Sequence, residues 1–412
     1  MSSLQTQLVK KTAIIESGDF NLSAPRYLEK IEINSIFDFV TIGEACNIIN
    51  GSTPKKDNNL FWDNGSIPWF TIDDIRKQGY KINETSKYTT KFALDNTSLK
   101  LIPRNTTLIC CTASVGVCAY NEIELTTNQQ FNALIINEDY QSKLDSKFLF
   151  WISTNLKDEL LRLSGKTSFD FISGKNLKKI SIPLPPLEIQ EQIVKEIEGY
   201  QQIIDGCRQV VENYKPLIDI DPSWERYSFG QLIDDNVIVF RNGSAISDVL
   251  KDGIPYIKVS DMNHAQNIPE IETSKNFVDV DFSKEKIVKI GATIFPKVGQ
   301  AINTDKKRIT KVDCFVDGNT AIVEIIDEQI LDNYFFFYIF NSIPLNSLCH
   351  DTGGYPSINK AGFRRAEICI PSIDNQKEIV EKLEQEREII EGNKELIKIY
   401  EKKINDKIKE LF

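Results

Sequence analysis

The chain has 412 residues, of which 26% are charged and 41% hydrophobic, and its formal net charge is −10. This length suits two to three domains, and the composition is that of a folded protein. Its longest strongly apolar run, residues 334–340, is far shorter than the roughly 20 residues that span a bilayer, and residues 1–20 contain no signal-peptide core. We therefore expect a cytoplasmic protein, neither membrane-embedded nor secreted.

The cysteines indicate no metal site. The eight cysteines never form a C-x-x-C pair, and the only two histidines are His264 and His350. A zinc site would need paired spacing with histidine nearby. We expect buried, reduced thiols.

In chain order, residues 1–35 form an N-terminal extension and residues 36–186 a first α+β domain. Apolar runs at 107–111 and 133–136, bounded by glycine, proline and asparagine, predict strands, and residues 146–163 predict a helix. Residues 187–221 then form a central spacer segment. Its long helix begins after Pro186 and ends before Pro216.

The same order recurs in the second half of the chain. Pro185, Gln190 and Val194 match Pro371, Gln376 and Val380 at a constant offset of 186, and further matches follow in the same order. Residues 222–372 are therefore a second α+β domain, with strands at 292–295 and 321–326 and a helix at 331–348, and residues 373–412 are a second long helix. We conclude that the chain is a tandem duplication.

Both long helices carry apolar residues at alternating steps of four and three, which is typical of a coiled coil. The first seam consists of Ile193, Ile197, Tyr200, Ile204, Cys207, Val211 and Tyr214. The second consists of Ile379, Leu383, Glu386, Ile390, Asn393, Ile397, Tyr400 and Ile404, and reaches Leu411.

We expect these seams to bury each other. At 1.5 Å per residue the helices are about 42 Å and nearly 60 Å long. The predicted architecture is two tandem α+β domains separated by an antiparallel pair of coiled-coil helices, with a pseudo-two-fold axis. The alternative is that each helix packs on its own domain as an ordinary amphipathic helix.

The negative charge is concentrated in the helices. Residues 187–221 contain eight acids and three bases and residues 374–412 eleven acids and nine bases, so the helices carry −7 of the −10. By contrast, residues 162–179 and 297–311 each contain five bases and one acid. Such local basic clusters suit a phosphate-contacting surface, although they could also be ordinary solvated side chains.

No motif for catalysis stands out. The sequence lacks G-x-G-x-x-G, a Walker phosphate loop, a G-x-S-x-G elbow and the N/D-P-P-Y tetrad of amino-methyltransferases. Nuclease-like acid-x-Lys triplets begin at Asp305 and Glu401, among other places, and such triplets are common in a highly charged chain. We predict a binding protein that has no cofactor and is not an enzyme.

Three stretches resemble the specificity subunit of type I restriction–modification enzymes. They are Gly51-Ser52-Thr53-Pro54 followed by Gly65-Ser66-Ile67-Pro68-Trp69, then residues 108–116 with Thr127-Asn128-Gln129-Gln130, and the helix entry from Ile182 to Val194. Residues 19–27 also resemble the segment that joins methylase and target domains in related fused enzymes. The second copy departs from the pattern, because Cys369-Ile370-Pro371 lacks the double proline and Asn242-Gly243-Ser244 lacks the Thr-Pro.

The resemblance implies two target-recognition domains, each reading one half of a gapped double-stranded DNA site. It also implies that the helices set the gap and dock two methyltransferase subunits, which restriction/translocase subunits join. The bases that we predict to position the DNA through its phosphates are Lys55, Lys56, Lys166, Lys175, Lys178, Lys179, Lys297, Lys306, Lys307, Arg308, Lys360, Arg364 and Arg365.

Two other interpretations remain open at this point. The chain could be a self-contained DNA methylase or nuclease fragment, or a duplicated scaffold for protein–protein contacts without a DNA role.

Overall fold

The computed structural model describes residues 37–164, 172, 174–246, 249–279, 287–349 and 355–412. The chain divides into two compact units, one ending at Gln209 and completed by Lys394–Phe412, the other spanning Val210–Asn393. The boundary therefore falls within both long helices. The predicted extension 1–35 and Lys166 lie outside the described residues.

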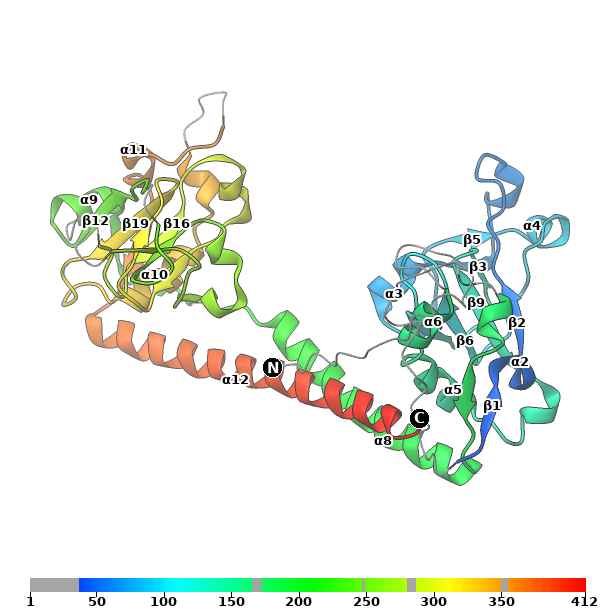
Figure 1. The fold of residues 1–412 in the computed structure, drawn as a ribbon. Helices are drawn as coiled ribbons and strands as arrows, with labels where there is room; N and C mark the ends of the chain where they lie inside the picture. Colours follow the sequence, from blue (N-terminus) through cyan, green and yellow to red (C-terminus); the bar gives the residue numbers. More distant parts are fainter. Residues whose placement is uncertain (1–36, 165–171, 173, 247–248, 280–286, 350–354) are drawn as a thin grey trace. The chain divides into compact units, whose positions relative to one another are not determined.

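The first unit contains a five-stranded sheet, a three-stranded sheet and a strand pair (Figure 1). The five-stranded sheet has the order β2 (Cys46–Asn50), β9 (Phe131–Ile136), β6 (Thr106–Cys110), β7 (Cys118–Asn121) and β4 (Lys81–Ile82). The three-stranded sheet has the order β5 (Tyr88–Thr89), β3 (Ile67–Phe70) and β8 (Thr126–Thr127), and β1 (Phe39–Thr41) pairs with β10 (Ser181–Pro183). The pairs β4–β7 and β3–β8 are parallel, and all the others are antiparallel.

The second unit repeats this topology strand for strand. Its five-stranded sheet has the order β12 (Ile238–Asn242), β19 (Thr320–Ile325), β16 (Thr293–Pro296), β17 (Arg308–Thr310) and β14 (Glu270–Ile271). The smaller sheets are β15 (Phe277–Val278), β13 (Ile254–Ile257) and β18 (Phe315–Val316), and β11 (Glu225–Ser228) with β20 (Glu367–Ile370). The parallel pairs, β14–β17 and β13–β18, are the counterparts of those in the first unit. The predicted duplication of an α+β domain is confirmed.

Helices connect and cover the sheets of each unit. In the first unit they are α2 (Ile42–Ala45), α3 (Ile72–Gln78), α4 (Lys91–Asn96), α5 (Ser146–Ser153), α6 (Lys157–Ser164), α7 (Gly174–Leu177) and the first part of α8 (Leu187–Asn213). In the second they are α9 (Phe229–Asp234), α10 (Asn333–Asn341), α11 (Lys360–Phe363) and most of α12 (Ile373–Lys409). Short 3₁₀ turns such as η2 (Asn59–Phe61) and η8 (Leu345–Leu348) complete them.

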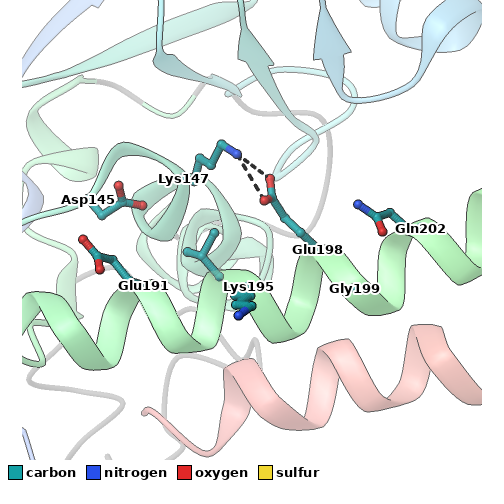
Figure 2. Close-up of a pocket in the computed structure, with 8 residues that line it drawn as sticks. Asp145, Lys147, Glu191, Lys195, Glu198, Gly199 and Gln202 are labelled. Atoms are coloured by element: carbon teal, nitrogen blue, oxygen red, sulfur yellow. Dashed lines mark hydrogen bonds and ion pairs between the residues drawn. The ribbon is translucent and has the colours of Figure 1, made fainter.

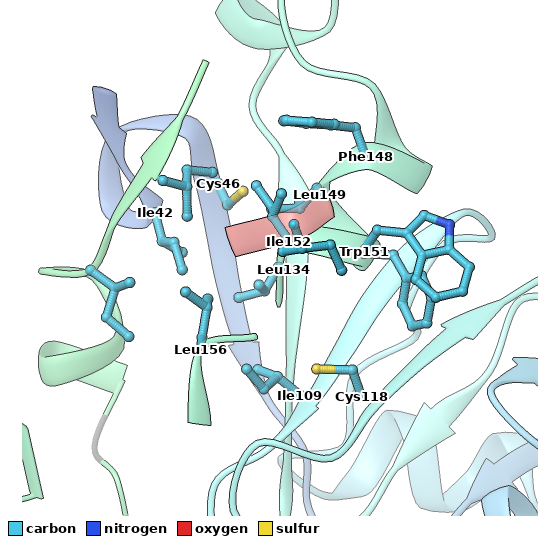
Figure 3. Close-up of a cluster of buried hydrophobic side chains, with 14 of the residues drawn as sticks. Ile42, Cys46, Ile109, Cys118, Leu134, Phe148, Leu149, Trp151, Ile152 and Leu156 are labelled. Atoms are coloured by element: carbon cyan, nitrogen blue, oxygen red, sulfur yellow. The ribbon is translucent and has the colours of Figure 1, made fainter. Parts of the chain in front are cut away.

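Helix α5 is the centre of the first core. Asp145 caps it by accepting a hydrogen bond from the Phe148 backbone N–H at 2.8 Å. Its residues from Phe148 to Ser153 are all buried, and they pack with side chains of the five-stranded sheet, including Ile109, Cys118 and Leu134 (Figure 3). Helix α10 has the same place in the second core.

Both of these helices are shorter than predicted. The Thr154 hydroxyl donates to the Trp151 carbonyl at 2.6 Å where α5 ends, and the chain restarts as α6. Pro344 follows α10 and cannot continue it, so the apolar run ends in η8.

In the first unit α8 pairs with the last turns of α12. Ile197 and Ile204 share one apolar cluster with Ile404, Ile408 and Leu411. Ion pairs join Glu196 to Lys407 at 2.7 Å and Arg208 to Glu401 at 2.6 Å. Because the partner numbers fall as the α8 numbers rise, the two helices are antiparallel, as predicted. Tyr200 and Tyr400 pack between these pairs with ring centroids 5.4 Å apart.

Near its N-terminal end each helix packs instead on its own domain. Ile193 and Val194 belong to the α5 cluster, and Leu383 packs on Phe337 and Tyr338 of α10. For these N-terminal turns the alternative interpretation is therefore correct, in which each helix packs on its own domain as an ordinary amphipathic helix. Within the predicted seam Glu386 is exposed, and Asn393 donates to the Ile389 carbonyl of its own helix at 2.8 Å, so it does not bond across a helix pair.

Candidate nucleic-acid interface

In the first domain three predicted lysines lie on the surface around α7. Lys175, Lys178 and Lys179 are exposed, whereas Leu177 and Ile180 between them are buried in the core. Within the described part of the chain, none of the three lysines forms an ion pair.

The backbone of this segment is anchored to α2. The Gly43 N–H donates to the Lys178 carbonyl at 3.0 Å, and the Ile42 N–H donates to the Ile180 carbonyl at 2.8 Å. A Cβ on Gly43 would lie 2.8 Å from the Lys178 Cβ, so a side chain there would displace the lysine. The core thus holds a basic edge at the surface, which suits contacts with phosphates.

Beside this edge lie two neighbouring hollows. The first, of about 370 Å³, is lined by Ile48, Asn50, Asn132, Gly174, Lys175 and Lys178. The second, of about 550 Å³, is lined by Asn50, Gly51, Ser52, Thr53, Ser98 and Gln129, and we call it the polar hollow. Asn50 lines both, so the basic edge and the polar hollow are continuous.

The polar hollow explains two of the sequence motifs. The Ser52 and Ser98 hydroxyls lie 2.8 Å apart, and the Thr53 hydroxyl donates to the Gln129 side-chain carbonyl. A Cβ on Gly51 would lie 2.0 Å from the Asn128 carbonyl oxygen, so only glycine allows the two loops to approach this closely. Amide and hydroxyl side chains are groups that recognise base edges. None of these residues is among the predicted site residues. The motifs that contain Ser52, Thr53 and Gln129 were the available signal for those three, whereas Ser98 lies in no motif.

Lys55 and Lys56 are exposed on the loop that leaves the polar hollow. The Trp62 indole N–H donates to the Lys55 carbonyl at 3.0 Å, and Trp62 packs edge-on against Trp69 with centroids 5.0 Å apart. The aromatic pair therefore holds the lysine-bearing turn.

The second domain has a smaller basic edge at α11. Lys360 and Arg365 are exposed, whereas Arg364 forms a two-point ion pair with Asp234, one contact of which measures 2.9 Å. The hydrogen bond from Arg364 lowers the pKa of Asp234. The Arg364 carbonyl accepts from Gly230 at 2.9 Å, which repeats the Lys178–Gly43 contact.

The prediction for residues 297–311 is wrong at one position, Lys307. The Lys307 side chain is fully buried, its ammonium pairs with Asp305 at 2.8 Å and lies 5.3 Å from the Phe340 ring centre, and burial lowers its pKa. The Arg308 guanidinium donates to the Met262 carbonyl at 2.7 Å and to the Lys307 carbonyl at 2.7 Å. The buried Lys307 therefore stabilises the fold and is not available to a phosphate, whereas the half-buried Arg308 remains a prediction.

The other two bases of this stretch that we predicted to contact phosphates, Lys297 and Lys306, are half-buried. Lys306 donates to the Asn263 side chain, and burial lowers the pKa of Lys297. They remain predictions.

A third hollow, of about 540 Å³, lies where α8 meets α5 (Figure 2). Acids and bases line it together, among them Asp145, Glu191 and Lys195, and Lys147 pairs with Glu198 at 2.9 Å. The hydrogen bond that Lys147 donates to the Glu198 carboxylate raises the pKa of Lys147. Such a mixed surface fits a protein partner better than a polyanion.

Among the described residues, no three or more His, Cys, Asp or Glu side chains are grouped so that they could hold a metal ion. All eight cysteines are free, and seven of them are buried. None of the described helices has the length and apolarity needed to cross a membrane.

The chain matches one family model twice. The model describes the type I restriction modification DNA specificity domain, and it matches residues 34–213 and 236–401. Two relatives agree. The Escherichia coli type I restriction enzyme EcoprrI specificity subunit is 31% identical over 189 residues, which cover 44% of this chain and 47% of that subunit. The Methanocaldococcus jannaschii type I restriction enzyme MjaIX specificity subunit is 22% identical over 366 residues, which cover 81% of this chain and 83% of that subunit.

Solved structures share the fold. The S subunit of a type I restriction-modification system from M. genitalium aligns over 93% of this chain and 98% of its own, with a TM-score of 0.54 and 14% identity. A chain from a study of complex assembly in the type I R-M system aligns over 91% of this chain and 97% of its own length, with a TM-score of 0.57 and 16% identity.

Proposed function

Because the chain belongs to the family of the type I restriction modification DNA specificity domain, we propose that it is the DNA-specificity subunit of a type I restriction–modification complex. The observation that carries this proposal is the repeated domain, since the two copies share one strand topology but present different side chains at their surfaces. Each copy reads one half of a bipartite target, and the sequence between the halves is not read.

In the first domain the basic edge positions the duplex and the polar hollow reads it. Phosphate contacts carry no sequence information, whereas Asn, Gln, Ser and Thr side chains distinguish base edges in a groove. The positioning residues are Lys55, Lys56, Lys175, Lys178 and Lys179 in the first domain and Lys297, Lys306, Arg308, Lys360, Arg364 and Arg365 in the second. The reading residues of the first domain are Asn50, Ser52, Thr53, Ser98 and Gln129.

The reactions belong to partner subunits. The helices dock two methyltransferase subunits, and restriction/translocase subunits join this core in the cytoplasm. Helix α12 supports the docking, because Ile389, Leu396 and Ile399 share one helical face and remain 60%, 40% and 42% exposed. The mixed-charge hollow at α5 and α8 adds polar contacts for the same kind of partner.

A domain exchange tests the proposal. Residues 36–186 are replaced by the corresponding domain of another specificity subunit, and methylated sites are sequenced in cells that carry the complete system. We expect one half of the modified sequence to change while the other half and the gap stay the same. A change in both halves, or methylation without a bipartite pattern, would contradict the proposal.

The rival function, a self-contained methylase or nuclease, is tested with the isolated chain. We expect neither methyl transfer nor cleavage of duplex DNA until the partner subunits are added. Activity of the chain alone would favour the rival.

A further inference from the structure

One buried glutamine recurs at the start of each long helix. Gln190 is the fourth residue of α8 and Gln376 the fourth of α12, and both are 0% exposed. A glutamine on a helix is ordinarily exposed, so its complete burial in both copies needs an explanation.

Both glutamines make the same three hydrogen bonds. The Gln190 Oε1 accepts from the Asp145 N–H at 2.8 Å, and its Nε2 donates to the Lys143 and Pro185 carbonyls, both at 2.7 Å. The Gln376 Oε1 accepts from the Asp332 N–H at 2.8 Å, and its Nε2 donates to the Ile330 carbonyl at 2.8 Å and the Pro371 carbonyl at 2.9 Å.

These bonds tie the helix to its own domain. Asp145 is the N-cap of α5, the helix that packs on the five-stranded sheet, and Asp332 is the N-cap of α10. One amide therefore joins the cap of the domain's central helix, the loop before it and the turn that leads into the long helix.

A second attachment follows eight residues later in both copies. Glu198 pairs with Lys147 of α5 (Figure 2), and Glu384 accepts from the Tyr338 hydroxyl of α10. Eight residues correspond to about 12 Å of helix. Two attachments this far apart fix the direction of the helix axis, which one attachment could not do.

The direction of the axis matters if the helix measures distance. The 27 residues of α8 extend for about 40 Å. A tilt of about 5° at the N-terminal end moves the other end by about 3.5 Å, close to the rise of one base pair, about 3.4 Å. If the joint bends by a few degrees, the protein would therefore accept gaps that differ by one base pair from the natural gap.

We propose that Gln190 with Glu198, and Gln376 with Glu384, are positioning residues that determine how strictly the gap between the two half-sites is kept. This inference rests on the proposed function. It assigns gap fidelity to the joint between helix and domain, in addition to the length of the helix.

The test uses the complete system in cells and a plasmid library that carries the two half-sites at the natural gap and at gaps one and two base pairs shorter or longer. Gln190→Met removes the amide at nearly constant volume. The measured quantity is the ratio of modification at sites whose gap is one base pair too short or too long to modification at sites with the natural gap. We expect this variant to raise the ratio at least tenfold while the half-site sequences stay unchanged. Gln192→Met, a change at an exposed glutamine on the same helix, should leave the wild-type ratio unchanged.

A merely structural role would lower modification of all sites in proportion and leave this ratio as it was, and that result would overturn the inference. If Gln190→Met does not accumulate, Glu198→Gln decides, because the Lys147–Glu198 pair is at the surface and its loss should not unfold the domain. We expect a smaller rise in the ratio, about threefold, and an unchanged ratio would again overturn the inference. If the wild-type system shows no bipartite preference at any gap, the proposed function itself fails, before any variant is compared.

Discussion

The two helix–domain joints share a glutamine but differ in what surrounds it. In the first unit α8 meets an aromatic group in which Tyr80 stacks on Phe150 at 4.9 Å, and its one ion pair there, Lys147–Glu198, is half-exposed. In the second unit α12 meets a charged network. Arg387 contacts Glu270 at 3.1 Å and also Glu384, while Tyr334 donates to Glu270 at 2.7 Å.

This difference shows which contacts the architecture requires. Both joints keep the glutamine with its three bonds and apolar packing on the domain, whereas only the second joint adds the network of Arg387, Glu270 and Glu384. Apolar contacts contain no group that titrates, but a poorly hydrated charge depends on its partners. The two joints should therefore respond differently to the same perturbation.

The largest effect is expected from Arg387→Met. It leaves Glu270, 12% exposed, and Glu384 without their shared cation, and loss of one partner of a poorly exposed ion pair costs about 2–4 kcal/mol. We expect the second unit to unfold at a lower urea concentration, with the first unit unaffected. Gln201→Met, at the matching position of α8, is the control and should change the free energy of unfolding by less than about 0.5 kcal/mol. Equal effects of the two substitutions would show that the network does not stabilise the joint.

The two units should also differ in how their stability changes at low pH. Burial alone would raise the pKa of Glu270, but hydrogen bonds from Tyr334 and Arg387 and the charges of Arg387 and Lys311 lower it overall. A carboxyl whose pKa is lowered by folding stabilises the native state above its unfolded pKa, and this contribution is lost as the pH falls through the folded value. We expect the second unit to lose stability first below about pH 4.5. Circular dichroism melts of wild type and Glu270→Gln from pH 7 to pH 3 measure this. The difference between them should shrink with acid, and a constant difference would contradict the assignment.

DNA binding should distinguish the lysines of the basic edge from a lysine that is already ion-paired. Lys178→Ala with Lys179→Ala should weaken binding of the assembled complex to all sequences and flatten its salt dependence by about one slope unit per lost phosphate contact. Lys289→Ala, which removes a lysine already paired with Asp313 at 2.7 Å, should leave the slope unchanged. The readout is the affinity for duplex DNA over a salt series, and equal slopes for all variants would remove these lysines from the interface.

The smallest effect is expected from Lys147→Met in the first unit. The Lys147 side chain is 44% exposed, and ion pairs of this kind contribute about 0.2–1 kcal/mol. The urea midpoint of the first unit should fall slightly, and less in high salt, because screening already weakens the pair. A loss as large as that of Arg387→Met would mean that the two joints are equivalent.

Much of the fold could be predicted from the sequence. The strand predicted at 107–111 is β6 (Thr106–Cys110), and that at 321–326 is β19 (Thr320–Ile325). Strand and heptad periodicities are local, so they are visible in a single chain. The duplication was equally visible, because both copies keep their motifs in the same order.

The site was harder to predict. Lys307 stands in a run of bases that suggests a phosphate surface, yet its side chain is fully buried beside Phe340 and paired with Asp305. Conversely, Ser98 and Gln129 carry no charge and lie far from Asn50 in sequence, but they share its hollow. Exposure depends on which distant segments fold over a residue, and charge alone does not reveal it.

The sequence by itself determined the repeat, the α+β character of each copy and the paired helices, because periodicity, proline positions and composition act over short stretches of chain. Only the tertiary structure decided which bases reach the surface and which residues attach each helix to its domain. The bonds of Gln190 show the reason. They reach loop residues more than 40 positions away, and such contacts exist only once the domain has folded around them.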